Sequence, residues 1–337
     1  MPNSKHYYQI TDDIYQVQLP LPFALNIVNC YLLRGDEGWT ILDTGLNTPQ
    51  SQQVWLDTFA ALEIKAGDIR QIVLTHYHPD HFGLSGWLQN WAKRSGSGDV
   101  PPVLMSHVDL ETARLVWWRE ENNRALSSWP SFWQACGVPA EMADLLHFHI
   151  DSTRDLTLPL PSYVESIPLA GTLRMGARNF KILYAPGHTD GQVMFYDPDD
   201  QLLLSGDHVL MKITPNISLW PLTRPDPLGR YLASLREFSV LDVRVALPGH
   251  RSLITNWGQR LEELLAHHDR RLNKMLAAVE PGSTAYEISR NVFDFNRLTS
   301  HEIRFAITET LAHLELMHVD GRLERTQEGV WRYDITK

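Results

Sequence analysis

The chain has 337 residues, and its 43% apolar and 21% charged residues are the composition of an ordinary folded protein. This length exceeds what one hydrophobic core usually supports, so we expect two domains. The net charge of -10 gives no general attraction to a phosphate backbone, so nucleic acid is not the expected partner, although a local basic patch is compatible with this charge.

The amino-terminal residues lack a secretory pattern, and no run of about 18 apolar residues marks a membrane span. These two features predict a soluble cytoplasmic protein without a membrane partner. Cys30 and Cys136 are too few for a disulfide scaffold, and neither has a neighbouring cysteine for metal binding. We expect both to be small buried side chains.

Five short apolar segments are each followed by a loop that contains His or Asp. Such segments, bounded by Gly and Pro, predict largely buried strands. They are residues 39–42 before Asp43, 72–74 before His76, 182–184 before His188, 202–204 before Asp207, and 243–247 before His250. Strands that lie side by side bring their terminal loops to one edge of a sheet, so we expect a site there. Helical patterns between the strands, such as the one that Thr48 caps, indicate an α/β domain over residues 1–256.

Residues 109–149 interrupt this alternation and are rich in tryptophan. We expect two or three helices here. One interpretation is an additional helical layer packed on the core; the other is a lid whose aromatic residues, Trp117 and Trp133 among them, line an apolar substrate pocket. His147 and His149 lack the acid or third histidine of a metal motif, so we interpret them as structural.

Residues 257–337 have a different character. Leucines at helical spacing from Leu261 predict a long amphipathic helix, and Thr284 with Glu287 and Thr299 with Glu302 have the capping-box spacing that begins two more. Two short segments between glycines then predict a hairpin. This order predicts a small, winged-helix-like carboxyl-terminal domain.

Residues 75–81, Thr-His-Tyr-His-Pro-Asp-His, place three imidazoles and a carboxylate directly after a buried strand. Imidazole and carboxylate groups suit zinc and related divalent ions. A catalytic ion takes about three protein ligands and leaves a position for water, so this cluster together with His188, Asp207 and His250 exceeds what one ion needs. The sequence therefore predicts two divalent metal ions, with zinc as the first expectation and iron or manganese as alternatives.

The segment His76 to His81 resembles the H-x-H-x-D-H signature of the metallo-β-lactamase superfamily, and the segments around His188, Asp207 and His250 resemble its later motifs in order. The resemblance covers about residues 26–250 and implies a four-layer αββα sandwich. It also implies the following ligand sets: His76, His78 and His188 for the first metal, Asp80, His81 and His250 for the second, and Asp207 as the bridge.

The resemblance gives Asp43 a supporting role behind the ligands, and its alternative is a turn-forming aspartate before Gly45. A hydroxide held between the two ions can attack a carbonyl or phosphorus near neutral pH. Asp80 is a candidate catalytic residue that orients this water or shuttles its proton. Tyr231 is a candidate for binding substrate, although we favour helix packing, and we favour a structural role for His208.

The carboxyl-terminal segment resembles the winged-helix domain of a subset that includes a mitochondrial β-lactamase-like endoribonuclease and fungal thioesterases. The leading hypothesis is hydrolysis of an ester, lactone or thioester of a fairly apolar, small-molecule acyl substrate. An RNA phosphodiesterase is the alternative: a winged-helix tail permits it, but Arg270, Arg271 and Lys274 form a thin basic patch that is equally typical of a solvated helix face. A β-lactamase is a further alternative, disfavoured because Asp207 stands where many of those enzymes have a cysteine. An iron-dependent redox relative and a binding protein with structural metal are weaker still, and a homodimer is compatible with the sequence.

Overall fold

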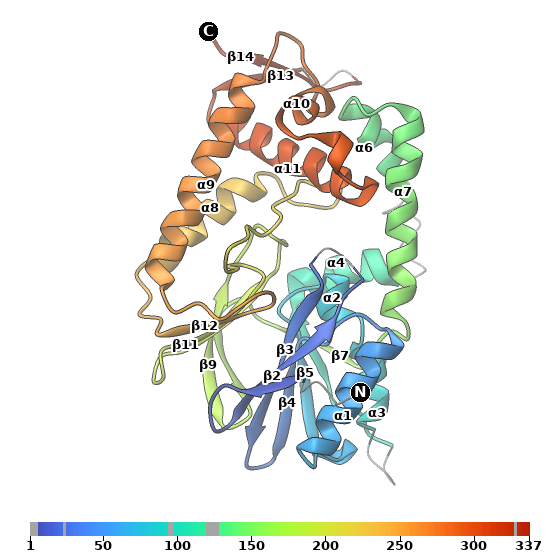
Figure 1. Cartoon of the computed structure of the whole chain (residues 1–337), viewed down its shortest axis with the longest axis vertical. Helices are drawn as coiled ribbons and strands as arrows, with labels where there is room; N and C mark the ends of the chain where they lie inside the picture. The colour runs from blue at the N-terminus through green and yellow to red at the C-terminus, as the bar shows by residue number, and fades with distance from the viewer. Residues whose placement is uncertain (1–5, 23–24, 94–97, 119–127, 327–328) are drawn as a thin grey trace.

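The computed structural model describes residues 6–22, 25–93, 98–118, 128–326 and 329–337, with the side chains of 147–152 excepted. Two β-sheets pack face to face in this part of the chain, and helices cover the outer face of each (Figure 1). This is the four-layer αββα architecture that the resemblance implied.

The first sheet has its strands in chain order, antiparallel from β1 to β4 and parallel from β4 to β7. Its strands are β1 (Tyr7–Gln9), β2 (Ile14–Pro20), β3 (Ile27–Gly35), β4 (Gly38–Leu42), β5 (Ile69–Val73), β6 (Val103–Ser106) and β7 (Val164–Ile167). The second sheet has the order β12-β11-β10-β9-β8, antiparallel except for the parallel pair of β11 and β12. Its strands are β8 (Gly171–Met175), β9 (Arg178–Tyr184), β10 (Val193–Asp197), β11 (Leu202–Gly206) and β12 (Val245–Pro248). All five apolar segments predicted as strands are strands.

The helices that precede β12 lie between strands along the chain. They are α1 (Pro49–Ala61), α2 (Pro79–Phe82), α3 (Ser85–Trp91), α4 (His107–Trp117), α6 (Trp129–Ala135), α7 (Ala140–Arg154) and α8 (Pro227–Phe238), with short 3₁₀ turns at Ala66–Asp68 and Asp155–Thr157. Thr48 caps α1 as predicted, because its hydroxyl accepts a hydrogen bond from the Ser51 N–H. Helices α4, α6 and α7 occupy the tryptophan-rich stretch, as expected; the side chains of His147 and His149 lie outside the described residues.

The cores follow from the alternation of side chains along each strand. Leu42, Val73, Phe195 and Leu204 point between the sheets and pack there. The alternate side chains of the first sheet pack against α1, α3 and α4. Those of the second sheet pack against α8 and the carboxyl-terminal helices. Both sheets are therefore covered on each face, and water reaches them mainly at the strand ends.

The carboxyl-terminal elements are α9 (Trp257–Ala277), α10 (Ala285–Val292), a 3₁₀ turn at Phe295–Arg297, α11 (Ser300–Val319), β13 (Leu323–Thr326) and β14 (Arg332–Ile335). The predicted order of three helices and a hairpin is present, and both predicted capping boxes form. Their apolar side chains join one continuous cluster with α6, α8 and the second sheet. This region shares a core with the catalytic part, so the domain boundary at residue 257 and the winged-helix assignment stay predictions.

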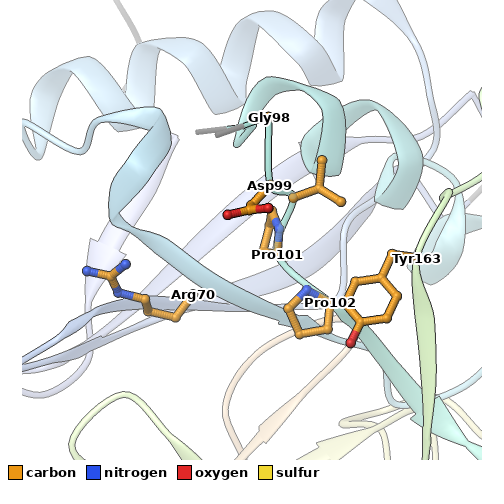
Figure 2. Close-up of a pocket in the computed structure, with 7 residues that line it drawn as sticks. Arg70, Gly98, Asp99, Pro101, Pro102 and Tyr163 are labelled. Carbon is orange, nitrogen blue, oxygen red and sulfur yellow. The ribbon is translucent and has the colours of Figure 1, made fainter. Parts of the chain in front are cut away.

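Cys30 and Cys136 are buried and unpaired, as expected. Among the residues that the structure describes, no helix combines the length and the apolar character needed to cross a membrane. A shallow pocket lies at the beginnings of the parallel strands β5, β6 and β7, lined by Arg70, Asp99, Pro102 and Tyr163 (Figure 2). The predicted metal-binding residues follow the ends of the strands, so this pocket is at the opposite side of the sheet.

Candidate metal centre

The predicted ligands converge at the carboxyl ends of strands from both sheets. His76 follows β5, Asp80 and His81 lie in α2, and His188, Asp207 and His250 follow β9, β11 and β12. Three sets of donor atoms lie within 4.8 Å of one another: His76, His78 and His188; Asp80, His81 and His250; and His76, His81 and Asp207. The first two sets are the two ligand sets that the sequence predicted.

The imidazole rings are fixed through their outer nitrogens. Nδ1 of His188 lies 2.9 Å from the carbonyl oxygen of Asn216, and Nδ1 of His250 lies 2.8 Å from that of Ile27. A carbonyl only accepts, so each Nδ1 carries the proton and donates it. In the neutral ring that a metal ion requires, each Nε2 therefore has the lone pair that binds the ion.

The same logic holds for the rings of the first sheet. The Thr75 hydroxyl donates to Asp43 and lies 2.9 Å from Nδ1 of His76, so it accepts a hydrogen bond from that ring. Nδ1 of His81 donates to Oδ2 of Asp43 at 2.9 Å. His78 is reversed: its Nδ1 lies 2.8 Å from Nε2 of His188 and faces the shared site.

Three of the inward-facing donor atoms have no hydrogen-bond partner in the protein. Nε2 of His76, Nε2 of His81 and Oδ1 of Asp207 are buried without a hydrogen bond. Leaving such atoms unsatisfied costs about 1–3 kcal/mol each unless something binds them. Convergent buried lone pairs and carboxylates are the donor set of a divalent cation, so the residues fit the predicted metal ions.

The electrostatics of the pocket also favour cations. Burial acts to lower the pKa of His250, but the carboxylates of Asp207 and Asp80 outweigh it and raise the pKa to about 10. Burial likewise opposes the charged form of His81, yet Asp207, Asp43 and Asp80 raise its pKa. Three buried or half-buried carboxylates thus attract positive charge to this site.

Asp207 lies between the two ligand sets. Its Oδ1 is 3.4 Å from Nε2 of His81, and its Oδ2 is 3.2 Å from Nε2 of His250 and 3.6 Å from Nε2 of His188. One carboxylate therefore faces members of both sets. This is the position that a bridging ligand requires.

The sequence itself is matched by two family patterns. Residues 24–250 match the metallo-beta-lactamase superfamily, and residues 272–336 match the carboxyl-terminal domain of metallo-beta-lactamase-like proteins. The chain belongs to the metallo-beta-lactamase superfamily. It is accordingly a metallo-hydrolase, and the predicted membership is confirmed.

Relatives of similar length match this chain over nearly all of its residues. The probable metallo-hydrolase YqjP of Bacillus subtilis is 26% identical over 95% of this chain and 96% of its own length. The crystal structure of a metallo-beta-lactamase family protein from Thermus thermophilus has a TM-score of 0.84 at 31% identity and covers 97% of this chain and 100% of that chain. A beta-lactamase domain protein from Burkholderia ambifaria has a TM-score of 0.81 at 26% identity, covering 100% of this chain and 97% of that chain.

Asp43 occupies the supporting place proposed for it. It has a positive φ of 56°, which turns its side chain back under the ligand loop. Its Oδ1 accepts the N–H of Thr75 at 2.8 Å, and its Oδ2 accepts the Thr75 hydroxyl and the His81 ring. Asp43 thus holds the rings of His76 and His81 without facing the metal positions itself.

Sequence reasoning missed Asp109, which ties the ligand loops of the two sheets together. It lies at the start of α4, and its carboxylate accepts hydrogen bonds from the N–H of Tyr77, the hydroxyl of Thr189 and the N–H of Gly191. Burial raises the pKa of this carboxyl to about 7. Nothing in the pattern around Asp109 distinguishes it from an ordinary first-turn aspartate of a helix, because its partners are distant in sequence.

A second missed network reaches the carboxyl-terminal region. The carbonyl of Asn216 holds His188, and the Asn216 side chain accepts the Ser218 hydroxyl at 3.1 Å. Ser218 and Thr308 of α11 share a hydrogen bond of 2.9 Å, and the Leu219 N–H donates to the Thr308 carbonyl. Helix α11 therefore supports the loop that fixes one metal ligand.

Tyr231 packs in the interior of the protein, and its role in binding substrate stays a prediction. Its side chain is fully buried in α8, and its hydroxyl donates to the carbonyl of His208 at 3.0 Å. A Cβ at Gly187 would approach the Tyr231 side chain to 2.4 Å, so the ring packs directly beneath the His188 loop. His208 is also buried, with its ring bonded to Ser234, which agrees with a structural role.

Trp117 and Trp133 likewise pack inside the protein. Trp117 is 5% exposed, stacks on Phe82, and donates its indole N–H to the carbonyl of Tyr77. Trp133 is 1% exposed and belongs to the cluster shared with the carboxyl-terminal helices. Both side chains thus pack in the interior of the protein, and their contact with substrate stays a prediction.

Proposed function

We propose that this protein is a binuclear hydrolase that cleaves an ester, lactone or thioester of a fairly apolar acyl substrate. The observation that carries the proposal is the placement of Asp207 between two complete sets of three donors, with unpartnered lone pairs facing inward. One ion would engage at most one set. Two divalent ions, zinc first among them, would satisfy all seven ligands.

These residues would hold metal ions, which would supply a water of lowered pKa and polarisation of a substrate carbonyl. The residues of the chain provide the remaining functions. Asp80 is 18% exposed at its side chain, more than Asp207 or His250, and its Oδ2 lies 3.3 Å from Nε2 of His250. An accessible carboxylate at this position can orient a water molecule and pass its proton to the leaving group.

The surroundings support an apolar acyl substrate. Tyr77 packs its ring against His78, with 5.0 Å between the ring centres. Leu219 and Trp220 are only half-buried and belong to the segment that supports His188. Apolar side chains that retain exposure beside polar donors are the usual lining of a site for a small molecule.

The RNA alternative has little support from the predicted basic patch. Arg271 pairs with Glu309 at 3.7 Å and covers the ring of Phe293. Lys274 donates to the carbonyl of Val292 at 2.7 Å. Two of the three basic side chains are therefore engaged within the carboxyl-terminal region itself.

A substrate panel on zinc- or manganese-loaded protein tests the proposal. Aryl esters, lactones, acyl thioesters, β-lactams and single-stranded RNA are compared, with Asp207→Ala as the control. We expect turnover of one or more of the first three classes, and at least about a thousandfold loss with Asp207→Ala, since the bridge serves both ions. Metal analysis should give two ions per wild-type chain.

Two results would contradict the proposal. Cleavage of RNA or β-lactams without any acyl hydrolysis would assign a different substrate class. A wild-type protein that binds one ion after saturation, and keeps its activity in Asp207→Ala, would exclude the binuclear arrangement.

A further inference from the structure

Arg304, in the second turn of α11, holds a guanidinium group without a carboxylate partner. Its central carbon lies 5.4 Å from the ring centre of Trp220 and 4.9 Å from that of Phe305, so two aromatic faces support the group. One terminal nitrogen lies 3.4 Å from Nδ1 of His301, and Nε is buried without a hydrogen bond. In the described part of the chain, no Asp or Glu forms an ion pair with Arg304.

Other arginines of the carboxyl-terminal region have their positive charge neutralised by a nearby carboxylate. Arg260, Arg271 and Arg325 each pair with a glutamate, namely Glu263, Glu309 and Glu315. Burial lowers the pKa of Arg304 to about 10, which expresses the cost of shielding its charge from water. Such a cost is offset when an anion binds the group.

The guanidinium borders the metal centre through Trp220. This ring, which supports the guanidinium, lies four residues after Asn216, whose carbonyl holds the ring of His188.

Helix α11 also contacts the loop that supports His188. The Thr308 hydroxyl, one turn after Arg304, also bonds the carbonyl of Arg304 and contacts the Ser218 hydroxyl, which belongs to the network behind His188. In Figure 1, α11 lies above α4 and α2, on the side of the sheets where the ligands gather. Arg304 thus sits at the border between the carboxyl-terminal region and the metal centre.

We propose that Arg304 binds an anionic group, a carboxylate or a phosphate, of the substrate that the metal centre hydrolyses. This inference rests on the proposed acyl hydrolysis and adds a charged end to its substrate. The planar fork of an arginine matches both anions through two parallel hydrogen bonds. The aromatic support by Trp220 and Phe305 holds the fork in place before substrate arrives.

Three esters of equal chain length test the inference on metal-loaded protein: para-nitrophenyl pentanoate, the half ester para-nitrophenyl glutarate, and para-nitrophenyl phosphonobutanoate. We expect the wild type to prefer one or both charged esters over pentanoate by about 10- to 100-fold in kcat/KM, mostly through KM. The larger preference identifies the carboxylate or the phosphate as the natural group.

Arg304→Gln should lose this preference for the charged esters, and Arg304→Lys should keep part of it. Arg297→Gln is the matched control, because it removes the same charge from the same region at a side chain that is 87% exposed. Equal wild-type rates on all three esters, or an equal loss on all three in Arg304→Gln, would overturn the inference.

A binding measurement separates this inference from the proposed function. Glutarate and phosphonobutanoate are titrated calorimetrically into the metal-loaded wild type and the Arg304→Gln, Arg304→Lys and Arg297→Gln variants. We expect at least one of the anions to bind the wild type and Arg297→Gln, with binding at least about tenfold weaker in Arg304→Gln. If no ester is hydrolysed, the proposed function fails, and this titration alone decides the role of Arg304: equal affinities in wild type and Arg304→Gln, or no binding of either anion, reject it.

Discussion

Two clusters of buried histidines lie in the part of the chain that the structure describes, and one of them has the properties of a metal site. At the sheet edge, His76 and His81 point their free nitrogens at Asp207. Between α9 and α11, Nδ1 of His268 lies 3.2 Å from Nε2 of His313, whose Nδ1 donates to the carbonyl of Glu309. Nε2 of His268 is then left with a lone pair and no hydrogen-bond partner.

Both clusters contain buried imidazoles with unpartnered nitrogens. They differ in whether the lone pairs converge on one point and in whether carboxylates surround them. The sheet edge gathers lone pairs from several strand ends around carboxylates, which raise the pKa of His250 to about 10. In the second cluster burial lowers the pKa of His268 to about 2 and that of His313 to about 4. Buried histidines alone therefore form neutral packing, and the surrounding carboxylates make a cation site.

Within this comparison, the largest expected effect is the loss of metal affinity on substitution of Asp43. Asp43 supports two ligand rings of the cluster at the sheet edge and none of the cluster between α9 and α11. Asp43→Asn replaces an acceptor oxygen by an NH₂ group that opposes the Thr75 and His81 donors. Loss of such support typically weakens metal affinity by about 10- to 100-fold, measured by competition with a chelator. His313→Gln is the control and should leave metal affinity unchanged; an equal loss in both variants would erase the distinction between the clusters.

A pH effect of intermediate size is expected from the second cluster. The pKa values of His268 and His313 lie below the usual 6.5, so the unfolded chain binds more protons between pH 6.5 and about 4. The free energy of unfolding should fall as the pH falls through this window, by up to about 1.4 kcal/mol per pH unit for each histidine. Denaturant titrations of His313→Gln should show a shallower pH dependence, and an identical slope would show that this pair does not titrate on unfolding.

The smallest effect is expected at Thr308, which links α11 to the metal centre without contacting a ligand. Thr308→Val keeps the shape of the side chain and removes its hydrogen bond to Ser218. One neutral hydrogen bond is worth about 1 kcal/mol, so metal affinity should drop by a few fold at most. The neighbouring Thr310→Val removes a bond to the Ala306 carbonyl within α11 and serves as control. A matched drop in both variants would assign the effect to helix stability.

The ligand set was predictable because it depends on local patterns. Each of His188, Asp207 and His250 follows an apolar strand, and strands of one sheet end at a common edge. The capping boxes of α10 and α11 were predictable for the same reason, since both partners lie within one turn.

The supporting roles of Asp109 and Thr308 were not predictable, because they depend on contacts between distant segments. Asp109 lies 82 residues from Gly191, and Thr308 lies 90 residues from Ser218. The aromatic stretch was ambiguous in sequence, because a tryptophan that packs and one that contacts substrate look alike. The structure adds that Trp117 and Trp133 are buried.

The ligands come from both sheets, and this has a consequence for folding. His76, His78 and His81 belong to the first sheet and its loops, whereas His188 and His250 follow strands of the second. An ion held by ligands from both sheets would therefore cross-link two segments that are distant in sequence, as a disulfide does in an oxidising compartment. The binding energy of such an ion also stabilises the folded state. The supply of metal would therefore affect the stability of the αββα sandwich as well as its activity.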